Sequence, residues 1–348
     1  MQTTAGVNRR GWQLLGLYWL LVLLASGGLF GTLAVMGPPA PPVVAELSLP
    51  PQPVPEAAPA APSPAPVAEA APPPAADPAP GTIPAADPAL LEAGPFGPVP
   101  RIAVDGRTSI RFYARPGPGR AETRPRIALV VGGLGMNAVL SEQAIDRLPA
   151  QATLAINPYA PRPGGLLDRA RGRGMEFLVS LPLEPNGYPA NDPGDRALLT
   201  RLSPAQNEER LLWVLSRFQG YVGAVGALGA LRGERYAALS EPFGTLQEHL
   251  RRRGLLFLDA RPGARNPDRA WGRTVDVVVD EPATRTEIDM KLGALERLAR
   301  ERGSAMGLIG DPTPVLVDRV EAWSRSLEER GAVLVPASSL IRRPEVTP

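Results

Sequence analysis

Four segments of the chain share one pattern, in which an arginine and a glycine precede a short apolar run. They begin at Arg173-Gly174, Arg253-Gly254, Arg302-Gly303 and Arg330-Gly331. A basic residue followed by glycine is typical of a helix C-terminus, where glycine takes the left-handed conformation. A short apolar run directly after it is typical of a strand that is buried on both faces. The repeated pattern therefore predicts an alternating α/β fold with a parallel sheet.

The same pattern of apolar runs predicts the strands. They are Ile127–Val131, Thr153–Ile156, Glu176–Val179, Tyr221–Val225, Leu255–Leu258, Val275–Val279, Ala305–Ile309 and Ala332–Val335. Three helices between them have explicit start signals, namely the capping boxes that begin at Ser203 and Thr284 and the Thr313-Pro314 pair. About eight strands and six helices in about 217 residues fit an irregular β/α barrel better than an open sheet.

The N-terminal part of the chain has a different character. Residues 11–36, from Gly11 to Met36, carry no charged side chain, and Arg9 and Arg10 precede them. Such a segment is long enough for a membrane-spanning signal anchor, and the basic flank places residues 1–10 in the cytoplasm. A cleaved signal peptide is the alternative reading.

The next part of the chain is rich in proline and alanine. Residues 38–100 hold 22 of the 43 prolines, six acidic residues and no basic residue. This composition predicts a disordered linker over residues 37–100. Residues 101–125 form a short lead-in with one extended candidate, Ser109 to Tyr113, and the folded domain is expected over residues 126–342.

Composition excludes several kinds of chemistry. The chain has no cysteine and a single histidine, His249, so cysteine nucleophiles, disulfides and multi-histidine metal sites are ruled out. The net charge is +2, and no run of basic residues is interleaved with aromatic residues. No nucleic-acid partner is therefore expected. His249 falls in the last turn of a predicted helix, where a histidine usually interacts with the helix C-terminus.

Several stretches resemble one known family when they are read in order. They include Ile127-Ala-Leu-Val-Val-Gly-Gly-Leu-Gly135, Thr153-Leu-Ala-Ile-Asn-Pro-Tyr-Ala-Pro161, Leu181-Pro-Leu-Glu-Pro185, Gly220-Tyr-Val-Gly223 and Phe257-Leu-Asp259. Together they resemble the divergent polysaccharide deacetylase family, over residues 126–342. The resemblance implies an irregular β/α barrel of polysaccharide-deacetylase type. It also implies an envelope protein related to enzymes that remove N-acetyl groups from glycans with a metal ion.

The chain departs from this family where the resemblance implies metal ligands. Gly132 and Gly133 stand where the family's first strand usually ends in two aspartates. Ser180, Ala227 and Asp311 stand where the family usually has histidines. A metal that activates water needs about three protein ligands and an open position. No zinc-type cofactor and no metal-binding residue is therefore expected in this chain.

Carboxylates remain at the predicted strand ends. Asp259, Asp311 and Glu184 are the candidate catalytic residues, as an acid/base pair with a third carboxylate. Two carboxylates also suit weak binding of Mg²⁺ or Ca²⁺, and each aspartate alone suits a turn cap. Because parallel strands end at one rim, the candidate substrate cleft consists of Gly132, Gly133, Ser180, Ala227 and Asp280. We expect the small residues there to leave a pocket wider than a metal site.

These observations favour a membrane-anchored member of this family that is linked to envelope glycan metabolism and whose catalysis is absent or strongly altered. The expected partner is an envelope polysaccharide or peptidoglycan, contacted from a single-pass position in the inner membrane with the C-terminal domain outside the cytoplasm. One alternative is an active hydrolase of a glycan substituent that uses Asp259, Asp311 and Glu184. Another is a non-catalytic scaffold for other envelope proteins.

Overall fold

The computed structural model describes residues 15–23, 81–119 and 121–344, and the chain divides into two units, Met1–Pro72 and Pro73–Pro348. In the first unit, residues 15–23 are helical. Within the described residues, no helix has both the length and the apolar character that a membrane crossing requires. The rest of the predicted anchor, residues 11–14 and 24–36, lies outside the described part of the chain.

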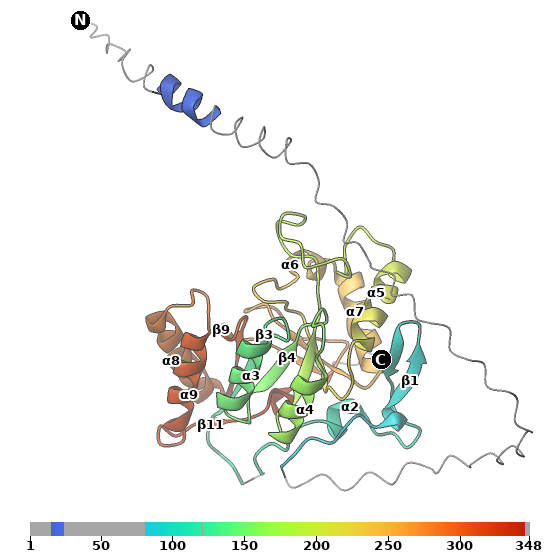
Figure 1. Ribbon diagram of the computed structural model, residues 1–348. Helices are drawn as coiled ribbons and strands as arrows, with labels where there is room; N and C mark the ends of the chain where they lie inside the picture. The colour runs from blue at the N-terminus through green and yellow to red at the C-terminus, as the bar shows by residue number, and fades with distance from the viewer. Residues whose placement is uncertain (1–14, 24–80, 120, 345–348) are drawn as a thin grey trace, which may run out of the picture. The chain divides into compact units, whose positions relative to one another are not determined.

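The second unit is built on one parallel sheet (Figure 1). Its order is β8 (Gly272–Thr274), β7 (Leu256–Asp259), β6 (Gly223–Val225), β5 (Phe177–Ser180), β4 (Thr153–Ile156), β3 (Arg126–Leu134), β10 (Ser304–Ile309) and β9 (Val277–Val278). A ninth strand, β11 (Val333–Leu334), pairs with the start of β3. Every pairing in this sheet is parallel. The α/β class with a parallel sheet, which the alternating pattern predicts, is confirmed.

The sheet is curled, because its two edge strands belong to one stretch of chain. Val275 donates a backbone hydrogen bond to the carbonyl of Asp259 at 2.9 Å. The next residue, Asp276, donates to the carbonyl of Met306 at 2.8 Å. Residues 272–278 therefore continue from the β7 side of the sheet to the β10 side. The predicted strand Val275–Val279 is replaced by β8 and β9 on either side of this crossing.

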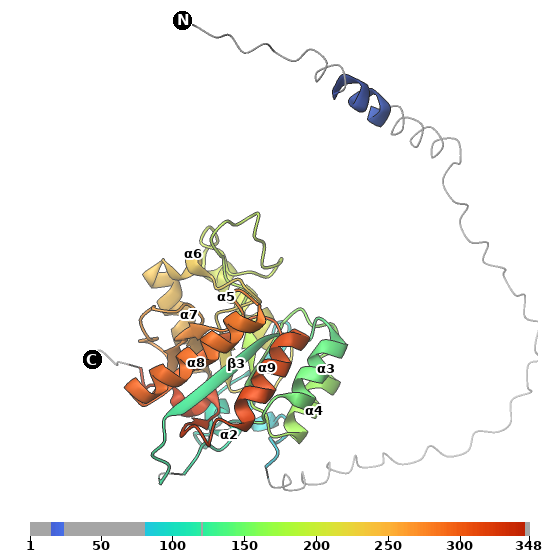
Figure 2. The same ribbon diagram turned by 90° about the vertical axis from the view of Figure 1, so that its left-hand side faces the viewer.

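Helices cover the outer face of the curled sheet. They are α3 (Ala138–Arg147), α4 (Gly164–Gly172), α5 (Pro204–Ser216), α7 (Ser240–Arg252), α8 (Arg285–Arg302) and α9 (Pro314–Arg325), and the short α6 (Glu234–Ala237) contacts α7. Figure 2 shows α8, α9 and α3 side by side along β3. Side chains alternate along β3, so Leu129 and Val131 pack towards the helices while Ala128 and Val130 pack inside the curl.

The predicted helix boundaries follow the cap chemistry. Ser203 forms a full capping box with Gln206, and the hydroxyls of Thr284 and Thr313 accept backbone hydrogen bonds at the starts of α8 and α9. The glycines of the four arginine-glycine pairs all have positive φ angles, between +65° and +80°. Each of them is followed by a strand, so the pattern that predicted these joints is confirmed.

The prediction for Ser109 to Tyr113 is wrong, because these residues start a short helix, α2 (Ser109–Phe112), and not an extended segment. One helical turn lets the chain bury Tyr113, whose side chain is 2% exposed. Its hydroxyl accepts a hydrogen bond from the backbone of Asp87 at 2.8 Å. The short apolar run has too few residues to reveal which period it follows.

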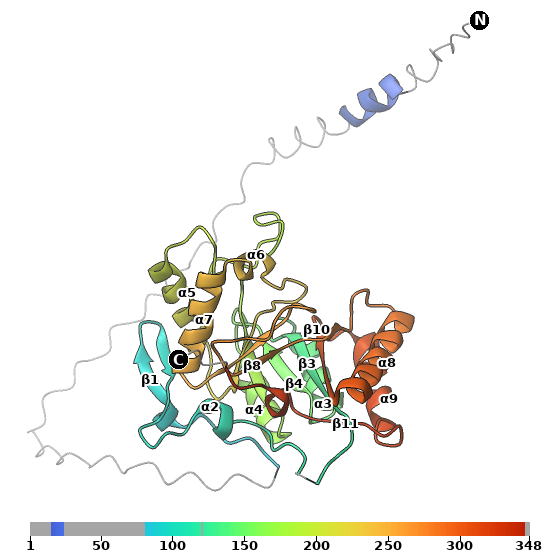
Figure 3. The same cartoon turned by 180° about the vertical axis from the view of Figure 1, so that it is seen from behind.

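The prediction of a disordered linker is wrong for residues 81–100. This stretch forms a 3₁₀ turn (Pro88–Leu90) and an antiparallel hairpin of β1 (Leu91–Gly94) and β2 (Gly97–Pro100). Leu90 and Val99 are buried, and Glu92 pairs with Arg253 at 2.6 Å. Figure 3 shows the hairpin beside α5 and α7. Residues 37–80 of the predicted linker lie outside the described residues.

Candidate functional site

The rim of the sheet at the ends of β3 and β10 is tightly packed. Gly133 has a φ angle of +68°, and a Cβ atom built on it would overlap Oδ1 of Asp311 and lie 2.8 Å from the carbonyl oxygen of Gly310. A Cβ on Gly132 would lie 3.1 Å from the same carbonyl oxygen. The expectation of extra room at these glycines is therefore wrong. The side chain of Asp311 and the backbone of Gly310 take up that space.

Asp280 holds the turn that carries Asp311. Its Oδ2 atom accepts hydrogen bonds from the backbone N–H groups of Gly310, at 2.9 Å, and Asp311, at 3.0 Å. Its Oδ1 atom is buried and has no hydrogen-bond partner among the described residues. Asp280 therefore fixes the end of β10, and one of its oxygens can still accept a hydrogen bond.

Asp311 is the exposed member of this carboxylate pair. One side of its carboxyl group packs on Gly133, and its oxygens lie about 4 Å from the Cβ position of Gly229. This partial burial raises the pKa of Asp311, and the negative charge of Asp280 raises that pKa further. The structure thus brings together Asp280 and Asp311 with Gly132 and Gly133.

Asp259 has a different set of partners. It ends β7, and its side chain is 3% exposed. Arg261 donates from Nη2 to Oδ2 at 2.7 Å, from Nε to Oδ1 at 3.0 Å and from its backbone N–H to Oδ1 at 3.1 Å. The guanidinium of Arg261 lies 5.0 Å from the ring centroid of Phe243. Asp259 is therefore held in a two-point ion pair that also closes a turn.

Glu184 is buried, and it anchors the loop that follows it. Its Oε2 atom accepts a hydrogen bond from the backbone N–H of Thr200, and its Oε1 atom lies 3.1 Å from Nε of Arg235. Its own backbone N–H donates to the carbonyl of Leu198 at 2.9 Å. These contacts give Glu184 a structural role at the base of residues 185–200.

The two remaining predicted cleft residues are buried. Ser180 ends β5 and is 2% exposed, beside Val225 in the sheet. Ala227 is 5% exposed and packs in the apolar cluster inside the curl. Neither side chain is open to solvent, so a substrate would reach the rim at Asp311 before it reached them.

A cation that sequence reasoning missed lies close to this rim. Arg232 forms a two-point ion pair with Glu281, with Nη2 donating to Oε2 at 2.8 Å. The hydrogen bonds to Glu281, together with the charges of Glu281 and, more weakly, of Glu234 and Asp280, raise the pKa of Arg232. Arg232 belongs to a loop without periodicity, so only the fold reveals that it lies near Asp280.

These residues do not fit the zinc-type centre that the family resemblance implies. Over residues 15–23, 81–119 and 121–344, no group of three or more His, Cys, Asp or Glu side chains is placed to hold a metal ion. Asp259 and Glu184 are engaged with arginines, which leaves the carboxylates of Asp280 and Asp311 at the rim, where Asp280 accepts a hydrogen bond from the backbone N–H of Asp311. Two carboxylates fall short of the about three ligands of a catalytic metal site.

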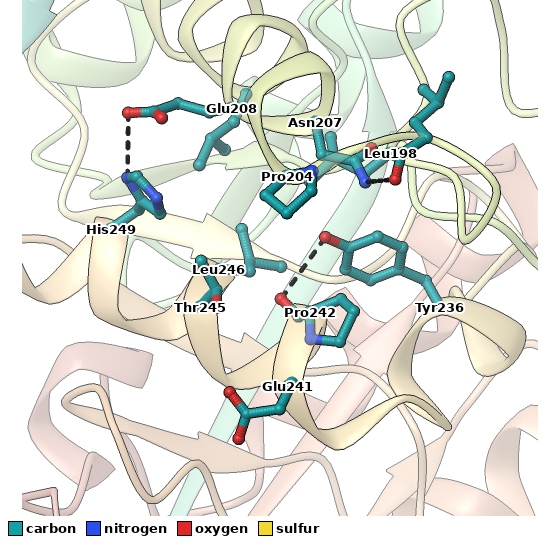
Figure 4. A pocket seen from close by; sticks show the side chains of 12 residues that line it. Leu198, Pro204, Asn207, Glu208, Tyr236, Glu241, Pro242, Thr245, Leu246 and His249 are labelled. Carbon is teal, nitrogen blue, oxygen red and sulfur yellow. Dashed lines mark hydrogen bonds and ion pairs between the residues drawn. The ribbon is translucent and has the colours of Figure 1, made fainter.

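A separate pocket of about 270 Å³ opens between α5 and α7 (Figure 4). Its lining is mostly apolar, with Leu198, Leu211 and Leu246 among the side chains. His249 lies in it, and its Nδ1 atom is 3.6 Å from Oε1 of Glu208. The histidine thus faces a carboxylate of α5. The sequence does not reveal this pocket, because its walls come from two separate helices whose packing the sequence pattern does not show.

Comparison with known proteins finds one family model that matches this chain. A family model described as divergent polysaccharide deacetylase matches residues 129–341. The chain is similar to the crystal structure of uncharacterized protein ATU2773 from Agrobacterium tumefaciens C58. That similarity has 31% identity and a TM-score of 0.64, over 70% of this chain and 99% of that chain.

Two further similarities are more distant. An uncharacterized protein of Haemophilus influenzae is 25% identical over 238 residues, which cover 64% of this chain and 79% of the relative. The catalytic domain of a peptidoglycan N-acetylglucosamine deacetylase from Eubacterium rectale is 14% identical. Its TM-score is 0.42, over 68% of this chain and 97% of that chain.

Proposed function

Because the chain belongs to the divergent polysaccharide deacetylase family, we propose that it is a glycan-associated protein that no longer performs metal-dependent deacetylation. The observation that carries this proposal is the contact between Asp311 and Gly133. In this chain, the side chain of Asp311 fills the space beside the strand end where the resemblance implies an aspartate pair. The curled sheet then serves as an irregular β/α barrel whose rim keeps the family shape without its ligand set.

The surviving carboxylates support the loss of that chemistry. A metal-bound water must be held next to an open coordination position. Asp259 is saturated by Arg261, and Glu184 by Thr200 and Arg235. Asp280 is occupied by two backbone amides. Each of these groups stabilises the fold, and only Oδ1 of Asp280 has no hydrogen-bond partner among the described residues. One such oxygen falls short of the about three ligands of a catalytic metal site.

The proposed ligand is an N-acetylated envelope polysaccharide or peptidoglycan, and Asp311 is the residue that would contact it. This carboxyl is exposed at the rim, where it can accept hydrogen bonds from sugar hydroxyl and amide groups. Asp259 and Glu184 shape the same rim from beneath through their arginine partners.

A sedimentation experiment with insoluble peptidoglycan tests this proposal. We expect the purified full chain to sediment with peptidoglycan and Asp311→Asn to weaken the binding several-fold. Asp289→Asn is the matched control, because Asp289 pairs with Arg319 on the outer helices. The proposal fails if the wild-type chain stays in solution, and that result would favour the scaffold alternative. Equal binding by Asp311→Asn and wild type would show that the rim is not part of the binding site.

One observation favours a second function, an active hydrolase of a glycan substituent. The raised pKa of Asp311, next to Asp280, is a property that general acids share. In this reading Asp311 would donate the proton, while the predicted partners Asp259 and Glu184 would position the rim through their arginines. Release of acetate from an N-acetylated glycan distinguishes the two functions.

We also propose that residues 11–36 anchor the chain in the inner membrane as a single-pass segment, with the second unit outside the cytoplasm. The absence of charge from Gly11 to Met36 and the preceding Arg9 and Arg10 support this arrangement. A reporter that is active only outside the cytoplasm, fused after Leu340, should be active. Activity of a cytoplasmic reporter at the same position would reverse the topology.

A further inference from the structure

Two polar pockets adjoin at the starts of β3 and β10. Gly133 and Asp311 lie at the opposite ends of these two strands. One has a volume of about 470 Å³ and the other of about 380 Å³. Both are lined by Arg273, Ser304 and Arg342. The first extends to Arg302, and the second to Arg126. The shared residues make the two pockets one continuous cleft.

The cleft carries more positive than negative charge. Its lining contains five arginines and two carboxylates, those of Glu122 and Asp276. Glu122 is paired with Arg124 at 2.7 Å, and Asp276 with Arg273 at 2.9 Å. Arg273 is also tied to Ser304, to which it donates at 2.8 Å. Both carboxylates are therefore already paired with arginines, and the lining has three more arginines than carboxylates.

The three other arginines keep most of their donors available. Arg126 donates to the carbonyl of Glu122 at 3.2 Å and pairs with no described carboxylate. Arg302 lies 3.6 Å from Oδ1 of Asp276, an aspartate already bound to Arg273. The side chain of Arg342 has no hydrogen bond or ion pair with the described residues, although its backbone pairs with Gly272.

We propose that this cleft binds a diphosphate group. One phosphate lies in each pocket, with Arg302 in the first, Arg126 in the second and Arg342 between them. Guanidinium groups donate pairs of hydrogen bonds that match phosphate oxygens, and they stay charged at all relevant pH values. Two adjoining pockets with a shared arginine favour two linked phosphates over a single one.

The diphosphate has two possible sources, a free soluble compound or the headgroup of a lipid. The chemistry at the cleft is the same for both. Inorganic pyrophosphate represents the first source, and vesicles that contain a lipid with a diphosphate headgroup represent the second. Comparison of the wild-type chain with the arginine variants distinguishes binding by the cleft from membrane binding by the N-terminal segment. The variants leave that segment unchanged.

Calorimetric titration of the full chain tests the proposal, with inorganic pyrophosphate and inorganic phosphate as probes. We expect pyrophosphate to bind about tenfold more tightly than phosphate, as one extra set of charge-assisted hydrogen bonds predicts. Arg342→Gln should weaken both ligands about tenfold. Arg126→Gln and Arg302→Gln should each remove the advantage of pyrophosphate. Arg285→Gln is the control, because Arg285 begins α8 and lies outside the cleft.

Thermal unfolding without ligand shows whether each variant is folded. The proposal is overturned if pyrophosphate binds no more tightly than phosphate, or if Arg285→Gln weakens binding as much as Arg342→Gln does. Vesicle flotation that depends on Arg342 would assign the diphosphate to a lipid headgroup. Flotation that is equal in wild type and Arg342→Gln, together with pyrophosphate binding, would assign it to a soluble compound.

Discussion

The carboxyl group of Asp311 packs on the backbone of Gly133, within the distance at which a Cβ atom would overlap it. Gly133 lies near the end of β3 and Asp311 follows the adjacent parallel strand β10, so their positions at one rim result from the strand register. Asp280 holds the turn at Asp311 by accepting two backbone hydrogen bonds. This contact explains how the rim is closed at positions 132 and 133, where the two glycines have no side chain.

Gly133→Ala is predicted to destabilise the fold more than an alanine at an open glycine of similar φ. Gly263 is the matched control, because its φ is +81° and no atom lies within 4 Å of its Cβ position. Both variants cost about 1–2 kcal/mol for the left-handed backbone. Gly133→Ala costs about 1–3 kcal/mol more through overpacking. Urea unfolding measures both values.

A second substitution isolates the steric part of that cost. In an Asp311→Ala background, the cost of Gly133→Ala should fall but stay above that of Gly263→Ala, because the overlapping carboxyl group is gone while the carbonyl oxygen of Gly310 still lies 2.8 Å from the Cβ position. Equal costs for both glycines in the wild-type background would contradict the packing of Asp311 on Gly133.

Asp311→Asn is predicted to change the pH dependence of stability. Burial and the charge of Asp280 raise the pKa of Asp311 in the folded chain. Between the ordinary and the raised pKa the folded state binds more protons than the unfolded state, so the free energy of unfolding falls as pH rises. The asparagine variant should therefore gain stability relative to wild type at neutral pH, and this gain should vanish below the ordinary pKa. Urea unfolding across this pH range would count against the account if the gain grew towards acidic pH.

Asp259 and Arg261 should show strong coupling in a double-mutant cycle. Asp259→Asn and Arg261→Gln each break the same two-point ion pair, so the double variant should cost much less than the sum. We expect a coupling energy of about 1–3 kcal/mol from urea unfolding, as for hydrogen bonds to charged groups. A value near zero would mean that Asp259 does not depend on Arg261 and remains available for chemistry.

The periodic parts of the fold were accessible from the sequence. Cap residues such as Ser203 and the arginine-glycine pairs act through local backbone chemistry, so they predict helix ends without knowledge of the tertiary structure. The hairpin at residues 91–100 was not accessible, because Leu90 and Val99 are isolated apolar residues in a proline-rich stretch. They become informative only when the rest of the fold provides a surface against which they are buried.

The site was predictable in its position along the chain but not in its packing. The strand ends identify Gly133 and Asp311 as neighbours at one rim, since parallel strands end together. The partners of each carboxylate depend on side-chain directions that a linear sequence does not contain. Asp259 next to Arg261 is the exception, because a spacing of two residues allows a turn with a local ion pair.

Metal analysis of the purified chain gives a further prediction. We expect less than stoichiometric zinc after dialysis, because the residues at Gly132, Gly133, Ser180 and Ala227 provide no metal ligands. Elemental analysis by mass spectrometry measures the content. About one tightly held zinc per chain would show that Asp280, Asp311 and other groups rearrange into a metal site.

Release of acetate from N-acetylated peptidoglycan by the full chain, with zinc, manganese or magnesium supplied in turn, tests the central claim most directly. The account predicts no release above that of a protein-free control under any of these conditions, because the rim holds no free ligand set for a metal-bound water. Acetate release by the wild-type chain that Asp311→Asn abolishes would contradict the account and establish an active hydrolase.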